Sequence, residues 1–391
     1  MNKDSWEILK LVDICLFFND GNWIESKDQS ESGIRLIQTG NIGNGYYINK
    51  EARAKFISED TFKNLKCTEV FEGDCLVSRL PDPIGRACIV PLIKGRAITS
   101  VDCSILRFKP NILASYFVYF SQCKKYTLNI KKSSTGSTRK RISRSNLGNI
   151  LVPIPPLPIQ AKIVKELDTL SDIINKKKEQ LAELDKLAQA TFYDMFGDPI
   201  KNEKEWEMRR LEELGDWASG GTPLRSNLLY FKGSIPWVTS GELNSLFIND
   251  TIEHINEEAI RNSNAKLIRK GSLLLGMYDT AALKSSINKR EMACNQAIAF
   301  SFINTKLCNT IYVYYSIQIN KEEYKKEQRG MCQKNLNLSM IKAISILYPP
   351  LFLQNQFAEK IEVIEQQKAL INQSITDTQL LFDYTMDKYF N

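Results

Sequence analysis

Residues 155–199 decide the fold, and they read PPLPIQAKIVKELDTLSDIINKKKEQLAELDKLAQATFYDMFGDP. The opening prolines let a helix begin but not continue through them, and Gly197 followed by Pro199 favours its end. Between these signals, apolar residues recur at alternating steps of three and four, which is the period of a coiled-coil seam. The seam comprises Ile163, Leu167, Leu170, Ile174, Leu181, Leu184 and Ala188, with Lys177 as its polar interruption. We therefore predict one long helix over 157–197, which needs a partner helix because a single core does not cover such a length.

A second copy of the same pattern supplies the partner. Pro155-Pro156-Leu157 and Gln160 are answered by Pro349-Pro350-Leu351 and Gln354. At the matching offset a second seam comprises Phe357, Ile361, Ile364, Lys368, Ile371, Ile375, Thr378 and Phe382, in which Lys368 is the charged interruption. We predict a second helix over 351–391, packed against the first as an antiparallel coiled coil whose polar interruptions fix the register.

The segments that precede the two helices are also repeated. Trp6-Glu7 opens the first segment and Trp206-Glu207 opens the second, and each is followed by a predicted helical turn, over 9–14 and 211–214. A strand and turn over 36–42 are answered by a strand and turn over 237–243. We expect Gly40 and Gly241 to adopt a positive φ at the bend, because glycine tolerates it.

Each segment also carries an aromatic cluster, over 116–120 and 311–315. Such a cluster could stack on bases, but within a helix it is more typical of a core. The predicted fold is mixed α/β, with two repeated α+β domains and two long helices, related by a pseudo-two-fold axis. The predicted parts are 1–156 and 198–350 for the globular domains, and 157–197 and 351–391 for the helices.

Composition limits the class of protein. The chain has 391 residues, 43% of them hydrophobic, which is enough for two or three domains with real cores. No apolar run approaches the length of a membrane span, and the first ten residues carry charges where a signal peptide has an apolar core. The nine cysteines lack a Cys-x-x-Cys pair and indicate free thiols in a reducing compartment. We therefore expect a cytoplasmic protein.

Catalytic and metal-binding signatures are missing from the sequence. His254 is the single histidine, which removes most histidine-based catalysis and multi-histidine metal sites, and we interpret it as a surface residue. We find no phosphate-binding Walker loop, no Gly-x-Ser-x-Gly motif and no convincing nuclease motif. The sequence predicts a chain that is not an enzyme and binds no metal or cofactor of its own.

The charge distribution points to a polyanionic partner. The net charge is +7, and the stretch from Cys123 to Ser145 contains no acidic residue. Hydroxyls, a glycine and clustered cations are the groups that hold phosphates. The candidate phosphate contacts are Lys131, Lys132, Ser134, Gly136, Thr138, Arg139, Lys140, Arg141 and Arg144. The alternative is a basic loop that contacts only solvent.

Two further arginines are candidates for reading bases. Arg79 and Arg86 flank a turn rich in proline, from which an arginine could contact guanine; the alternative is a surface charge at the end of a strand. In the second repeat the region comparable to this turn has Tyr278, Lys284 and Lys289. The counterpart of the basic stretch contains Arg329 and Lys334, and acidic residues dilute its charge.

At this point the motifs resemble a known family. Ser219-Gly220-Gly221-Thr222-Pro223, followed by the stretch from Gly233 to Gly241, resembles the opening of a target recognition domain in the DNA specificity subunit of type I restriction-modification enzymes. Gly73-Asp74 with the turn from Ser78 to Arg86 resembles the same family, as does Pro155-Pro156-Leu157 before a long helix. The first repeat departs from the Gly-Gly-Thr-Pro opening, because it has Asn19-Asp20-Gly21-Asn22 there.

The resemblance implies a role in sequence-specific recognition of double-stranded DNA, in a system of phage defence. Each recognition domain would read one half of a bipartite target, and the helix pair would set the spacer between the halves. The implied partners are two methyltransferase subunits, which dock on the helices, and motor and endonuclease subunits. S-adenosylmethionine and ATP with magnesium would bind to those partners. The main alternative is a coiled-coil scaffold that joins proteins without reading DNA, and a fused restriction enzyme is less favoured because its motifs are missing.

Overall fold

The computed structural model describes residues 6–136, 140–278, 281–326 and 335–391. The chain forms two compact units. Unit 1 comprises Met1–Lys177 with Gln373–Asn391, and unit 2 comprises Lys178–Asn372. Each unit therefore takes one part of each long helix, so the compact units do not end where the helices begin. The long helices are α5 (Leu157–Phe196) and α11 (Leu351–Phe390).

Unit 1 is built from three small antiparallel or mixed sheets and four short helices. Its strands are β1 (Glu7–Lys10), β2 (Cys15–Asp20), β3 (Gln29–Ser30), β4 (Ile34–Ile37), β5 (Phe56–Ile57), β6 (Glu69–Val70), β7 (Cys75–Ser78), β8 (Ala87–Ile89), β9 (Ala97–Thr99), β10 (Cys103–Phe108) and β11 (Leu151–Ile154). Its short α-helices are α1 (Glu59–Asn64), α2 (Ala114–Phe120), α3 (Lys124–Ser133) and α4 (Arg144–Gly148). The strand orders are β2-β10-β7-β8, β3-β5-β4-β9-β6 and β1-β11.

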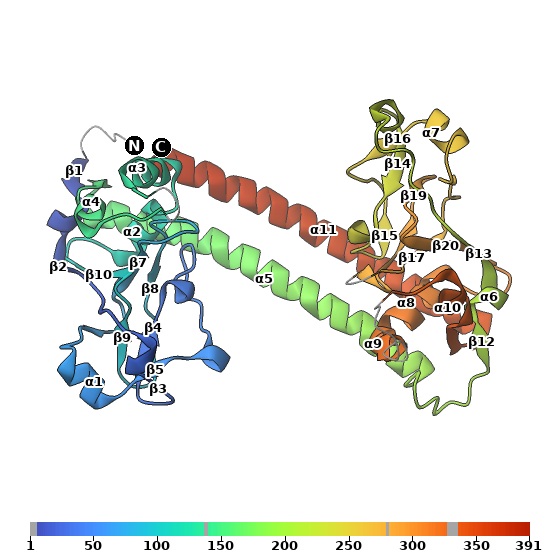
Figure 1. The fold of residues 1–391 in the computed structure, drawn as a ribbon, viewed down its shortest axis with the longest axis horizontal. Coiled ribbons are helices and arrows are strands. Elements are labelled where there is room, and N and C mark those ends of the chain that lie inside the picture. Colours follow the sequence, from blue (N-terminus) through green and yellow to red (C-terminus); the bar gives the residue numbers. More distant parts are fainter. Residues whose placement is uncertain (1–5, 137–139, 279–280, 327–334) are drawn as a thin grey trace. The chain divides into compact units, whose positions relative to one another are not determined.

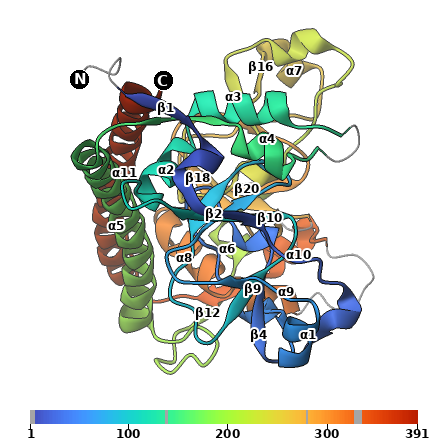
Figure 2. The ribbon, with the colours of Figure 1, turned by 90° about the vertical axis from the view of Figure 1, so that its left-hand side faces the viewer.

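The sheet β2-β10-β7-β8 separates two layers of unit 1. Helices α2, α3 and α4 lie on one side of it with the long helices, and the sheet that contains β4 and β9 lies on the other side (Figures 1 and 2). The aromatic cluster of α2 is core, as predicted, because Tyr116, Phe117 and Phe120 are completely buried. Met386 and Phe390, near the end of α11, pack into the same core.

Unit 2 repeats this plan. Its strands are β12 (Met208–Arg210), β13 (Gly215–Ser219), β14 (Ile235–Val238), β15 (Phe247–Ile248), β16 (His254–Ile255), β17 (Leu273–Gly276), β18 (Ser285–Asn288), β19 (Ala293–Cys294), β20 (Ile298–Ile303) and β21 (Ser345–Leu347). Its short α-helices are α6 (Leu211–Leu214), α7 (Glu257–Arg261), α8 (Thr310–Ile319), α9 (Lys321–Lys326) and α10 (Leu338–Ala343). The strand orders are β13-β20-β17-β18-β15, β16-β14-β19 and β12-β21. In both units the first strand therefore pairs with the strand that precedes a long helix.

The seam residues of α5 and α11 are buried or half-buried, as the coiled-coil pattern predicts. In unit 1 the Tyr389 hydroxyl donates to Glu166, 2.7 Å away, so the end of α11 meets the start of α5. In unit 2 Phe192 packs on Phe357 and the start of α11 meets the end of α5. Within each unit the two helices run antiparallel. The predicted fold class, mixed α/β with repeated domains and an antiparallel pair of long helices, is confirmed.

A buried glutamine fixes the start of each long helix against its globular core. Gln160 is fully buried; its Oε1 accepts from Leu113 N at 2.9 Å, and its Nε2 donates to the carbonyl oxygens of Asn111 and Pro155. Gln354 is also fully buried, accepts from Asn309 N at 2.9 Å and donates to Pro349 O at 2.8 Å. Each glutamine thus satisfies the main chain before the aromatic helix, α2 or α8, which a buried apolar residue could not do.

Two local predictions were wrong. Leu9 lies in strand β1, because its main chain pairs with Val152 of β11, and the helical turn begins only at Leu11. Gly40 and Gly241 have no positive φ and lie instead in short 3-10 helices, Thr39–Asn41 (η4) and Ser240–Glu242 (η7). In each turn a side-chain oxygen three residues on accepts the main-chain N–H of the residue that opens the turn.

The single histidine lies in β16, where its ring nitrogen is 2.7 Å from the Asp250 carboxylate and its side chain is partly exposed. In the described part of the chain, no helix is long and apolar enough to cross a membrane.

Candidate functional site

The basic stretch of unit 1 is partly helical. Lys131 and Lys132 lie in the last turn of α3, not in a loop, and both are exposed. The helix forms because Tyr126 and Ile130, one turn apart, are buried on its other face. Ser134 follows the helix, and its hydroxyl donates to the Ile130 carbonyl at 2.6 Å. The two lysines are therefore presented to solvent by a helix that is fixed to the core.

A narrow loop follows α3 and carries the rest of the basic candidates. Thr135 and Arg141 close it through two main-chain hydrogen bonds of 2.9 and 2.8 Å. Gly136 has a φ of +108°, a conformation that suits glycine, and Lys140 is exposed. Thr138 and Arg139 lie outside the described residues. The main-chain pairing of Thr135 with Arg141 therefore closes the neck of this loop.

The two remaining basic residues of this stretch are already bonded within unit 1. Arg141 forms an ion pair of 3.0 Å with Asp102, and Arg144 donates to the side chain of Asn19. Arg141 thereby ties the neck of the loop to the turn that follows β9. Because Arg144 remains exposed, it is the more available of the two to an additional partner.

Arg79 is a buried structural residue. Its side chain is 4% exposed, pairs with Asp20 at 3.0 Å and donates to the carbonyl of Val101. Burial lowers the pKa of Arg79 from its ordinary value, and the Asp20 carboxylate opposes that shift. The Asp20 carboxylate also accepts from the Ser104 hydroxyl at 2.7 Å. A base edge cannot reach this guanidinium in the conformation described, so the structure does not place Arg79 as a base reader.

Arg86 is buried as well, at 8% exposed. Its three nitrogens donate to four carbonyl oxygens, which belong to Thr39, Ile42, Leu80 and Pro83, at 2.6–3.0 Å. Four of the five N–H groups of its guanidinium are therefore engaged by the main chain. The prediction that Arg86 contacts guanine does not fit this position, since buried and exposed arginines cannot be told apart from the sequence.

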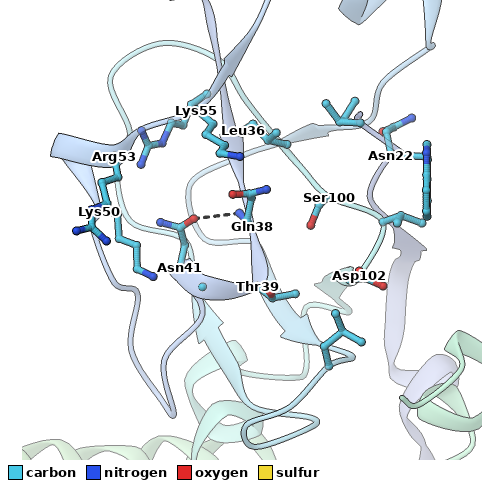
Figure 3. A pocket seen from close by; sticks show the side chains of 16 residues that line it. Asn22, Leu36, Gln38, Thr39, Asn41, Lys50, Arg53, Lys55, Ser100 and Asp102 are labelled. Carbon is cyan, nitrogen blue, oxygen red and sulfur yellow. Dashed lines mark hydrogen bonds between the residues drawn. The ribbon is translucent and has the colours of Figure 1, made fainter. Parts of the chain in front are cut away.

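A pocket that the sequence did not indicate (Figure 3) is lined by Thr39 and Val101, to whose carbonyl oxygens Arg86 and Arg79 donate. Strands β4 and β9 are parallel neighbours and end together, at the paired residues Ile37 and Thr99. The chain leaves both strands at the same edge, which is where parallel strands place ligand-binding residues. The cavity there is about 350 Å³ in volume. Its lining comprises Asn22, Trp23, Ile24, Arg35, Leu36, Gln38, Thr39, Gly40, Asn41, Lys50, Arg53, Lys55, Leu80, Ser100, Val101 and Asp102.

The pocket is rich in positive charge. Lys50, Arg53 and Lys55 are exposed on its rim, and none of them forms an ion pair with any described residue. Arg35 also contributes to the lining but is buried, with its guanidinium 5.6 Å from the centre of the Phe56 ring. Asp102 is the one acidic residue of the lining, and Arg141 already neutralises it. The pocket therefore presents a positive surface beside the basic loop.

Unit 2 places Lys284 at the position equivalent to Arg86. Lys284 directly follows Leu283, whose N–H donates to Gly276 O, just as Arg86 follows Gly85, whose N–H donates to Ser78 O. The Lys284 ammonium donates to the Asn244 side chain at 2.9 Å, just after the η7 turn, and Tyr278 packs against the core of unit 2. Arg329 and Lys334 lie outside the described residues.

The structure also resolves how the early loops of the two repeats correspond. In unit 1, Gly21 N donates to Cys103 O at 2.9 Å, and in unit 2, Gly220 N donates to Ile298 O at 3.1 Å. A Cβ at either glycine would lie 2.2 or 2.3 Å from a carbonyl oxygen, too close for any other residue. Asp20-Gly21 therefore occupies the place of Ser219-Gly220, although the neighbouring residues differ.

Comparison with known proteins agrees with this duplicated plan. The family model described as "Type I restriction modification DNA specificity domain" matches residues 3–185 and again 203–378. A specificity subunit of the type I restriction enzyme MjaIX from Methanocaldococcus jannaschii is 23% identical over 391 residues, which cover 94% of this chain and 89% of the relative.

Two solved structures share the fold. The type I restriction-modification S subunit from M. genitalium aligns with a TM-score of 0.61 at 13% identity, over 99% of this chain and 96% of its own. A structure titled as the basis of complex assembly and conformational transition of the type I R-M system aligns with a TM-score of 0.60 at 15% identity, over 99% and 97%. The two matched regions span most of the sequence, and the chain therefore belongs to the type I restriction modification DNA specificity domain family, with two copies of the domain.

Proposed function

We propose that this type I restriction-modification specificity subunit reads a bipartite target in double-stranded DNA, with one half read by each unit. The observation that carries the proposal is the duplicated frame. This frame comprises the glutamine clamp, Gln160 or Gln354, that fixes a long helix to its core, together with the parallel strand pair and the glycine turn, and it occurs twice. The polar side chains that the frame presents differ between the two copies. One frame with two sets of contacts is what a reader of two different half-sites needs.

Within this proposal the basic stretch of unit 1 contacts phosphates. Lys131, Lys132 and Lys140 are exposed on α3 and the loop after it, and phosphate contacts draw on exposed lysine and arginine. Ser134, Gly136, Thr138, Arg139 and Arg144 belong to this proposed surface of unit 1, and Arg329 and Lys334 are separate proposed phosphate contacts of unit 2. These contacts would position the chain on DNA without reading the sequence.

The proposed assembly supplies the chemistry from other subunits. The long helices would set the spacer between half-sites and dock two methyltransferase subunits, and motor and endonuclease subunits would complete the complex. S-adenosylmethionine and ATP with magnesium would bind to those partners, and this chain would contribute recognition without catalysis. The scaffold alternative is not favoured, because the family model describes a DNA specificity domain in both repeats.

The experiment is a genome-wide map of methylated adenines in cells that express this chain with a cognate methyltransferase, compared with cells that lack the chain. We expect a bipartite motif with a fixed gap that occurs only when the chain is present. A methylation pattern that does not depend on the chain would overturn the proposal.

A further inference from the structure

We propose that the pocket at the ends of β4 and β9 is the base-reading site of unit 1. In this inference, which rests on the proposed function, Gln38 is a specificity-determining residue that contacts the edge of a base pair. Lys50, Arg53 and Lys55 hold the phosphates that flank this base pair.

Gln38 occupies the position from which a base would be read. It is the first residue after β4, and its main-chain N–H donates to Asn41 Oδ1 at 3.0 Å. Asn41 is itself held, since its Nδ2 donates to the carbonyl of Ile48 at 3.0 Å. Figure 3 shows the Gln38 side chain near the middle of the pocket, with Ser100 and Asp102 on one side and Lys50 and Arg53 on the other. A glutamine amide can donate to and accept from adenine at the same time, so adenine is the base that its chemistry favours.

The charge around Gln38 fits the DNA backbone. Lys50, Arg53 and Lys55 are exposed and have no acidic partner among the described residues, whereas the surface cation Arg96 of the same unit is paired with Glu59 and Glu69. Unpaired cations around a polar recess attract a polyanion, and each phosphate that they neutralise releases counterions. These three cations are therefore available to bind DNA phosphates.

At this edge of the sheet the two units share the same main-chain arrangement but carry different side chains. In unit 2, β14 and β19 are also parallel neighbours, with Val238 paired to Cys294 at their ends. The residue after β14 is Thr239, where unit 1 has Gln38. Thr239 donates from both its N–H and its hydroxyl to the Glu242 carboxylate at 2.8 Å. The same backbone position therefore carries a glutamine amide in one unit and a threonine hydroxyl in the other, as expected of a position that distinguishes targets.

Both buried arginines hold the walls of the pocket. Arg86 donates to the carbonyl oxygens of Thr39 and Ile42, on either side of the turn after β4. Arg79 donates to the carbonyl of Val101, in the turn after β9. They are positioning residues: each fixes one of the two turns between which Gln38 lies, and neither reaches into the pocket.

The first test replaces Gln38 with alanine in the full chain, assembled with its methyltransferase subunits. Duplexes selected from a randomised pool by the wild-type and variant complexes are sequenced. We expect the variant to lose preference at one base pair of one half-site, with about 5- to 150-fold weaker binding to the wild-type target. The other half-site should be unchanged. An unchanged preference at every position, or a change confined to the other half-site, would overturn the inference.

The second test removes the rim charges in the variant Lys50→Ala/Arg53→Ala/Lys55→Ala. Binding should weaken for all sequences alike. The negative slope of log affinity against log salt concentration should become shallower by about 3. The matched control is Lys94→Ala, which removes an exposed charge before β9, at the opposite end of that strand from the pocket; its salt slope should match the wild type. Equal slopes for the triple variant and the wild type would contradict the phosphate contacts.

The wild-type complex separates the two levels of failure. If it selects no bipartite target, the proposed function fails. If it selects one but the Gln38→Ala complex selects the same one, only the pocket assignment fails. Adenosine monophosphate at millimolar concentration should leave DNA binding unchanged, because a single phosphate lacks the neighbouring contacts; displacement of the DNA would identify the pocket as a nucleotide site and overturn the inference. Circular dichroism and melting curves show that each variant is folded.

Discussion

The two units solve the same packing problem with different chemistry at the end of β2 in unit 1 and of β13 in unit 2. In unit 1 the buried Arg79 and Ser104 flank the half-buried Asp20, to which they are joined by an ion pair and a hydrogen bond. In unit 2 the equivalent positions hold Met277, Ser219 and Ala299. The main-chain frame is the same, since Arg79 O accepts from Ile142 N and Met277 O accepts from Leu336 N. The fold therefore does not need the ion pair. Unit 1 has one further contact: the Arg79 guanidinium donates to the carbonyl oxygen of Val101, which lines the pocket.

The largest expected effect comes from breaking this pair in unit 1. Asp20→Ala leaves the Arg79 charge buried without its partner, and we expect a loss of about 3–5 kcal/mol in the free energy of unfolding. Hydrogen exchange measured by mass spectrometry resolves the loss by segment, in peptides from β2, β7 and β10.

The control for Asp20→Ala transplants the residues of unit 2. The triple variant Asp20→Ser/Arg79→Met/Ser104→Ala removes both charges together, and its stability should lie within about 1 kcal/mol of the wild type. If the triple variant is as unstable as the single one, the two units are not interchangeable at this position and the comparison fails.

Replacing either glutamine clamp, Gln160 or Gln354, should have a smaller effect on stability, similar in the two units. Gln160→Met and Gln354→Met keep the length of the side chain but remove its acceptor and donor, so buried main-chain groups lose partners in each unit. We expect each variant to lose about 1–3 kcal/mol in urea unfolding. A loss in one unit and none in the other would show that only one of the clamps is required.

The smallest expected effect lies in the seam. Lys368 in unit 2 is half-buried between Asp185 at 2.9 Å and Glu365 at 2.7 Å, whereas Ile174 occupies the corresponding position of the unit 1 seam. Burial would lower the pKa of Lys368, but its hydrogen bonds to the two carboxylates raise it above the ordinary value. Lys368→Ile should change stability by less than about 1 kcal/mol, since the lost pairing is offset by apolar burial. Calorimetry at two salt concentrations measures this, and a loss above about 2 kcal/mol would show that the ion pair is needed in that unit.

The sequence predicted the long helices and their seams well because a period of three and four is a local signal. Proline at the start and glycine at the end of α5 mark boundaries that depend on the backbone alone. The repeat was equally visible, since Gln160 and Gln354 must be glutamines to serve both donors and acceptors. These features follow from rules that act within one turn of helix or at one residue.

The pocket could not be predicted in the same way. Its residues come from five separate segments, and only the parallel pairing of β4 with β9 brings Gln38 and Ser100 to one edge. Arg79 and Arg86 were predicted to contact bases for a related reason: the sequence does not distinguish a buried arginine that donates to carbonyl oxygens from an exposed one. Gly21 corresponds to Gly220 because at both positions another main chain approaches too closely for a side chain. The residues beside these glycines differ, so the sequence does not show the correspondence.

The packing of Met386, Tyr389 and Phe390 into the core of unit 1 has a consequence for synthesis. Tyr116 and Phe120, against which Phe390 packs, leave the ribosome long before it does. The whole of unit 2, residues 178–372, is translated in between, which takes about 10–40 s at typical elongation rates. Unit 1 is thus synthesised first but completes its core last. Until the end of α11 has been synthesised, the apolar surface of unit 1 must be covered by something other than that helix.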